Sequence, residues 1–125
     1  MALCGPMRKG GLHLTPQMIE AAYELLRATP PFRGWRLPSG DQIEFCVGMA
    51  RHTAETRPLA EGYRLMVSNQ CVGTLDRLLI SVAHEMVHIY QHRTRRETAN
   101  TEHNRHWHQV AARICRLHRW DGKEF

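Results

Sequence analysis

The sequence predicts an α+β fold with an N-terminal helix, a small three-stranded sheet, a central helix and a C-terminal helix. Apolar residues recur at helical spacing in three segments, and apolar and polar residues alternate in the region between the first two of them. The length of 125 residues suits one hydrophobic core. We therefore assign residues 1–12 to a flexible leader and residues 13–125 to a single domain.

The N-terminal helix is expected to begin at Pro16, because Thr15 can cap it and a proline suits the first helical turn. Pro30 and Pro31 should end this helix, since the residue before a proline is disfavoured in the helical conformation. The segment from residue 32 to residue 41 contains further glycine and proline residues, and we expect it to form a loop.

Three strands are expected in the middle of the chain. Residues 43–49 alternate between apolar and polar side chains, which is typical of a half-buried strand. Residues 51–56 predict a second, more polar strand, and residues 58–62 predict the turn that follows it. Alternation resumes at residues 63–67, so a third strand should end near Ser68.

Residues 75–93 are expected to form a long helix, capped by Thr74 and with Asp76 in the first turn, where an acidic side chain favours the helix dipole. Apolar side chains cover most of its circumference, which is typical of a buried helix. Residues 93–102 should form a polar loop, and two aromatic residues in the tail, residues 120–125, could pack back on the domain. The apolar face of the C-terminal helix consists of Trp107, Val110, Ala111 and Ile114.

Composition and charge exclude several classes of protein. No apolar segment is long enough for a membrane helix, and the first residues lack the apolar core of a secretory signal. The four cysteines form no Cys-x-x-Cys pair, which excludes a zinc ribbon, and we expect free thiols in a cytoplasmic protein. The net charge is +5, and 15 of the 17 basic residues are arginine. These arginines either form an ordinary solvated surface or bind phosphate groups.

The central helix carries a His-Glu-x-x-His motif formed by His84, Glu85 and His88. Two histidines four residues apart share one helical face and can hold one zinc ion. The glutamate, about 100° further round the helix, can reach a water at the metal without being a ligand. Burial of two imidazoles and a carboxylate without partners would cost free energy, and a metal ion removes that cost. The motif therefore predicts a zinc site.

A catalytic zinc site needs a third protein ligand. Thr94 stands where a closely spaced third histidine would be required. Five residues further on are candidates: Glu97, Glu102, His103, His106 and His108. On a helical wheel of the C-terminal helix, His103 falls within the apolar stripe, His106 lies at its edge and His108 points away. We therefore predict His103, facing the core from the first turn of that helix, as the third ligand.

Two segments, LLISVAHEMVHIYQH at 78–92 and HNRHWHQVAARICRLHRWD at 103–121, resemble the SprT-like (Spartan-related) zinc metallopeptidases. The resemblance implies a zincin-like fold, Zn²⁺ as cofactor and a third histidine that begins a helix, with an aromatic residue four positions later. It also implies that YRLMVSN at 63–69 is the edge strand that flanks the active-site helix. Residues 104–106 depart from the glycine-containing turn usual in the family.

The expected function is a zinc endopeptidase that uses Glu85 as general base on a protein or peptide substrate, with DNA-associated proteins among the candidate substrates. DNA is a candidate second partner, and no membrane partner is expected. An extended substrate could pair with the strand at 63–68. Four residues are candidates for a second group that stabilises the oxyanion: Tyr63, Tyr90, Arg105 and His106.

One alternative function is a non-catalytic, zinc-stabilised module that binds nucleic acid through the arginines of the C-terminal helix and the preceding loop. Another is a peptidase-like protein that has become an inhibitor or an interaction partner. Glu85 favours the enzyme, because a purely structural zinc site needs no glutamate there and tends to close with a fourth ligand.

Overall fold

The computed structural model describes residues 10–125, so most of the expected leader at residues 1–12 lies outside the described residues. The helices of the described chain are α1 (Pro16–Arg27), α2 (Leu75–Thr94) and α3 (Arg105–His118), and the strands are β1 (Ile43–Gly48), β2 (Ala54–Pro58) and β3 (Tyr63–Ser68). Short 3₁₀ turns occur at η1 (Phe32–Gly34), η2 (Gly40–Gln42) and η3 (Gly122–Glu124). The α+β class is confirmed, and each expected helix and strand is present within a few residues of its predicted bounds.

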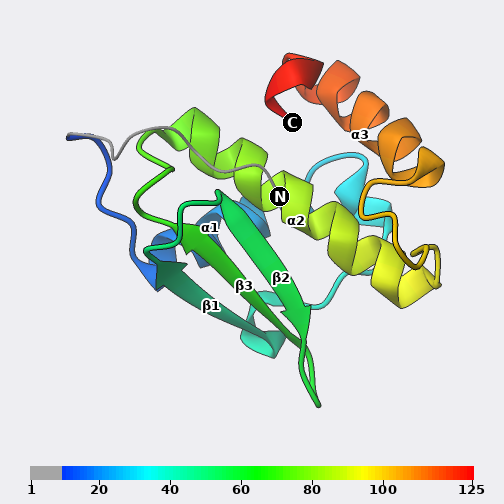
Figure 1. The fold of residues 1–125 in the computed structure, drawn as a ribbon, viewed down its shortest axis with the longest axis horizontal. Helices are drawn as coiled ribbons and strands as arrows, with labels where there is room; N and C mark the ends of the chain where they lie inside the picture. Colours follow the sequence, from blue (N-terminus) through cyan, green and yellow to red (C-terminus); the bar gives the residue numbers. More distant parts are fainter. Residues whose placement is uncertain (1–9) are drawn as a thin grey trace.

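The sheet has β3 at its centre, parallel to β1 and antiparallel to β2 (Figure 1). The expectation that residues 63–69 form an edge strand is therefore wrong. Both sides of β3 are hydrogen-bonded to neighbouring strands, and five of its six residues are buried. The edge strand that contacts α2 is β2, in which only Ala54 is buried. A half-exposed polar strand suits an edge, whereas a strand buried along most of its length suits the centre.

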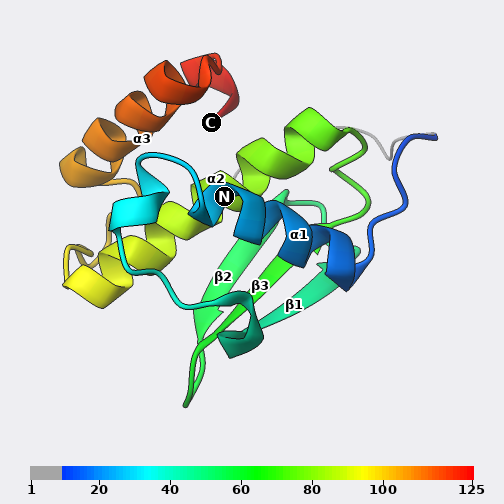
Figure 2. The same cartoon turned by 180° about the vertical axis from the view of Figure 1, so that it is seen from behind.

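Helix α2 is the central element of the molecule. It packs against α1 on one side and against β2 and β3 of the sheet, while α3 covers another of its faces. Figures 1 and 2 show α2 lying between the sheet and α3. This position explains why apolar residues surround most of α2, since it has a packing partner in nearly every direction. The largest fully buried side chains include Tyr23, Phe32, Leu65, Leu78, Met86 and Ile114.

Side-chain caps fix where each helix begins. The hydroxyl of Thr15 accepts a hydrogen bond from the backbone nitrogen of Met18, and Thr74 does the same for Arg77, as predicted. Helix α3 is capped by Asn104, so it begins at Arg105. His103 therefore precedes the helix, and the expectation that it lies in the first turn is wrong.

No helix within residues 10–125 is long and apolar enough to cross a membrane. Cys46 and Cys115 are free thiols. Cys71 is disulfide-bonded, so the expectation of a free thiol is wrong for this residue. The absence of a Cys-x-x-Cys pair excludes a zinc ribbon, but it carries no information on pairing between distant cysteines.

Candidate metal centre

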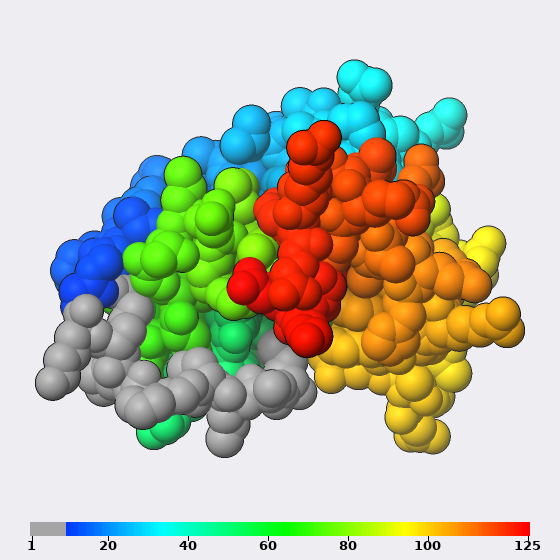
Figure 3. All heavy atoms as spheres, turned by 90° about the horizontal axis from the view of Figure 1, so that it is seen from above, coloured from blue at the N-terminus to red at the C-terminus, as the bar shows by residue number. Residues whose placement is uncertain are grey.

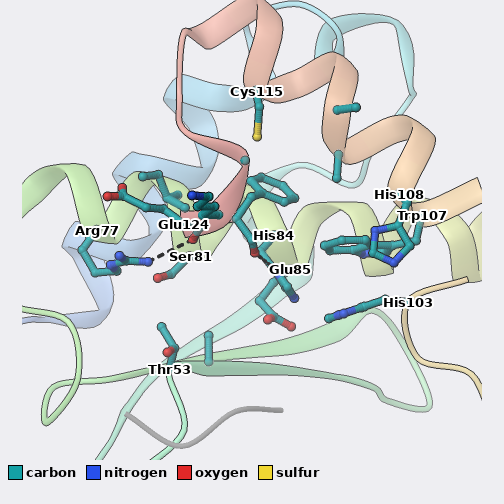
Figure 4. Close-up of a pocket in the computed structure, with 17 residues that line it drawn as sticks. Thr53, Arg77, Ser81, His84, Glu85, His103, Trp107, His108, Cys115 and Glu124 are labelled. Carbon is teal, nitrogen blue, oxygen red and sulfur yellow. Dashed lines mark hydrogen bonds between the residues drawn. The ribbon is translucent and has the colours of Figure 1, made fainter. Parts of the chain in front are cut away.

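Three histidines converge at the junction of α2 and the loop before α3. His84 and His88 lie one turn apart on α2. His103 approaches His84 from that loop (Figure 4). One ring nitrogen from each residue lies within 4.8 Å of the corresponding nitrogens of the other two. The ring centroids are 4.9 to 5.2 Å apart. The three residues predicted as ligands are thus brought together in an arrangement that could hold one metal ion.

Two ring nitrogens of this cluster have no partner in the described part of the protein and are free to bind a metal ion. The Nε2 atoms of His88 and His103 are buried and have no hydrogen-bond partner within residues 10–125. Such unpartnered buried nitrogens are rare, because they lose their bonds to water and gain none in return. Coordination of a metal ion would satisfy both nitrogens at once.

The protonation states also suit metal binding. Burial lowers the pKa values of His84 and His88 to about 4, and burial lowers the pKa of His103 as well. All three imidazoles are therefore neutral near pH 7 and keep a lone pair for a metal. The indole of Trp107 stacks on His103 with ring centroids 3.9 Å apart, which restrains that imidazole in the cluster.

Glu85 lies beside the histidines, and its side chain is almost fully buried. Burial raises the pKa of this carboxyl group to about 7. The hydroxyl of Thr56 on β2 donates a hydrogen bond to Oε1 of Glu85 over 2.8 Å, and this hydrogen bond lowers the pKa of Glu85. A carboxyl group with a pKa near neutrality can both accept and release a proton at physiological pH.

Thr56 was not among the candidate residues of the sequence. It lies 29 residues from Glu85, and the two meet only because β2 packs against α2. The alternation of β2 places Thr56 and the buried Ala54 on the same face, toward the helix. That alternation is the one feature of the sequence that could have indicated its position.

Two cavities adjoin the cluster. The larger, of about 550 Å³, lies between α2, α3 and the C-terminal turn, and Figure 4 shows its lining. The smaller, of about 350 Å³, is bordered by the acidic residues Glu55, Glu97 and Glu102. Glu85 lines both cavities, so this residue separates one from the other.

The other candidates for third ligand have different places. Glu97 and Glu102 are exposed and line the smaller cavity, and His108 is exposed beside Trp107. His106 accepts a hydrogen bond from Nε2 of the buried Gln91 over 3.0 Å. The metal-binding group found within residues 10–125 therefore includes none of these four residues.

None of the four candidates for a second oxyanion-stabilising group lines either cavity. Tyr63 is hydrogen-bonded to Nδ1 of His92 over 2.6 Å, and the ring of Tyr90 stacks on Trp35. Arg105 is exposed, and His106 is engaged by Gln91. The structure therefore supports none of them in that role.

Comparison of the chain with models of protein families found no match, and comparison with curated proteins found none either. The relationship to SprT-like metallopeptidases stays a prediction from two segments of sequence. The chemistry of the site rests on the three histidines, the buried glutamate and the contacts that hold them.

The contact between Thr56 and Glu85 leads to a test. Thr56→Val removes the hydroxyl and keeps the branched shape, so the ionised form of Glu85 loses a hydrogen bond and its pKa should rise. We expect the titration profile of the Glu85 carboxyl group, followed by NMR in the metal-free protein, to move to higher pH by about one unit or more. Thr56→Ser keeps the hydroxyl and should retain the original profile. Identical profiles for the valine variant and the unmodified protein would contradict this role of Thr56.

Proposed function

We propose that this protein is a zinc-dependent endopeptidase of the SprT-like type, in which His84, His88 and His103 hold the metal and Glu85 is the general base. The observation that carries this proposal is the convergence of three neutral imidazoles beside a buried carboxyl group that is not one of the ligands. Structural zinc sites are usually closed by four protein ligands, whereas the cluster within residues 10–125 has three. Zinc in a three-ligand site acts as a Lewis acid that activates water and polarises a carbonyl group.

Glu85 would move the proton in this reaction. Thr56 engages Oε1 of Glu85, which orients the carboxylate so that Oε2 takes a proton from the attacking water. The water oxygen forms a bond to the carbonyl carbon of the substrate, and the peptide C–N bond breaks. The proton held on Glu85 then passes to the leaving amine. A pKa near 7 suits both halves of this transfer.

We propose that an extended peptide pairs with the outer edge of β2 and not with β3. Strand β3 has no free edge, whereas β2 is hydrogen-bonded on one side only among residues 10–125. Thr56, at the middle of β2, contacts Glu85, so a peptide along this edge would run past the site. Pro58 ends the strand and has no backbone N–H, which would limit the pairing to the preceding residues.

DNA is proposed as a second partner on a separate surface. On α3, Arg113 and Arg116 are exposed, whereas Trp107 and Ile114 of the same helix are buried toward the core. The arginines of this region are all exposed: Arg93, Arg95, Arg96, Arg105, Arg113, Arg116 and Arg119. Such a surface would contact phosphates without touching the histidine cluster.

The test of the proposed function combines zinc content with cleavage of casein and histone, each with and without DNA. We expect one zinc per chain, and cleavage that stops when a chelator removes the metal and returns when zinc is restored. Stimulation by DNA would support the second partner. A protein that holds zinc and cleaves neither substrate under any of these conditions would favour the non-catalytic module.

A further inference from the structure

The residues that follow α3 fold back over the histidine cluster. The chain reverses at Arg119, which has a positive φ of 59°, and η3 then begins with Asp121 as its cap. Figure 3 shows these C-terminal residues, in red, lying across the junction between α2 and α3. The guanidinium of Arg77, on α2, donates a hydrogen bond to the backbone oxygen of Glu124 over 3.0 Å (Figure 4). This bond ties the segment to the helix that carries the motif.

Phe125 contacts His84, one of the three histidines of the cluster. Its backbone oxygen lies 2.6 Å from Nδ1 of His84. Because an oxygen of this kind only accepts, Nδ1 must carry the proton. An imidazole that binds a metal is neutral and has one N–H, so Nε2 of His84 is left with the lone pair. The contact therefore selects the tautomer that offers Nε2 to a metal.

The ring of His84 is restrained by a polar contact as well as by packing. By contrast, the Nε2 atoms of His88 and His103 are buried and have no hydrogen-bond partner within residues 10–125. The phenyl ring of Phe125 adds a second type of contact, with centroids 5.5 Å from those of His84 and Trp107.

We propose that residues 122–125 are a positioning element of the metal centre, in which the backbone oxygen of Phe125 fixes the tautomer and orientation of His84, and Arg77 holds the segment in place. The inference rests on the proposed metal site and adds to it a dependence of metal affinity on the C-terminal segment. Contacts of this kind to a metal-binding histidine commonly change metal affinity by about 10- to 100-fold.

A matched pair of variants separates the backbone oxygen from the side chain. Removal of Phe125 alone takes away both, whereas Phe125→Ala takes away only the phenyl ring. We expect zinc affinity, measured by competition with a chromophoric chelator, to fall by about 10- to 100-fold when Phe125 is removed. Phe125→Ala should bind zinc almost as tightly as the unmodified chain. Equal affinity in all three proteins would overturn the proposal, and so would a loss in Phe125→Ala as large as in the shortened chain.

A second measurement does not depend on zinc or on catalysis. The ¹⁵N shifts of the His84 ring in the metal-free protein report which nitrogen carries the proton. We expect a protonated Nδ1 in the unmodified chain and in Phe125→Ala, and a mixture of tautomers when Phe125 is removed. Circular dichroism of the metal-free proteins checks that the shortened chain remains folded. A chain that binds no zinc but shows this tautomer change would refute the proposed function and keep the positioning contact. An unchanged Nδ1–H in the shortened chain would refute the contact itself.

Discussion

Glu85→Gln is expected to lower peptide hydrolysis by about 100- to 10,000-fold while the zinc content of the protein stays unchanged. Glutamine has the shape of glutamate, and its amide oxygen can still accept the hydrogen bond from Thr56. It cannot take a proton from water, so the reaction loses its base and the cluster keeps its ligands. Casein turnover and metal analysis on the same sample give the two quantities.

Thermal melting shows whether Glu85→Gln loses activity because it unfolds or because it lacks the base. Burial raises the pKa of Glu85 from 4.5 to about 7, so ionisation of this carboxyl group opposes folding as the pH rises through that range. A neutral glutamine removes this penalty. The metal-free Gln variant should therefore be at least as stable as the metal-free parent at pH 7, as measured by thermal melting.

Glu61→Gln is the matched control, because this glutamate lies in the exposed turn between β2 and β3 and lines neither cavity beside the cluster. It should leave both turnover and zinc content unchanged. Wild-type turnover in Glu85→Gln would overturn the enzyme assignment. Loss of zinc from the same variant would make Glu85 a ligand and not a base.

Features that depend on neighbouring residues could be predicted from the sequence. The caps at Thr15 and Thr74 and the motif on α2 are of this kind, because a cap or a shared helical face involves residues within one turn of each other. His103 was identified through the apolar stripe of α3, although Asn104 caps the helix and leaves His103 just before it. The ring still reaches the cluster, where it stacks on Trp107.

Features that depend on the packing of distant segments could not be predicted. Nothing local indicates that Thr56 meets Glu85 or that Phe125 meets His84, since 29 and 41 residues separate these pairs. The contact of Phe125 uses a backbone atom, which no residue type reveals. The central position of β3 is an exception, because the sequence does indicate it. Residues 65–67 are consecutively apolar, as in strands buried on both faces, and β3 is central.

The choice of third ligand is tested by comparing His103→Ala with His106→Ala. The two histidines lie three residues apart, yet His103 belongs to the cluster and His106 is hydrogen-bonded to Gln91. We expect His103→Ala to lose zinc, because two imidazoles alone cannot complete a three-ligand site. His106→Ala should keep it. Metal analysis after dialysis distinguishes these results.

The same pair should differ in thermal stability. A ligand that binds only the folded state stabilises it by about 2.7 kcal/mol at 100 times its Kd, which for a chain of this size raises the Tm by roughly 10 °C. We expect such a shift for the unmodified protein and for His106→Ala, and its disappearance in chelator. His106→Ala should melt lower than the parent both with and without zinc, because Gln91 loses a partner in the core. His103→Ala should show no zinc-dependent shift. A zinc-dependent shift that survives in His103→Ala and vanishes in His106→Ala would assign the third position to His106.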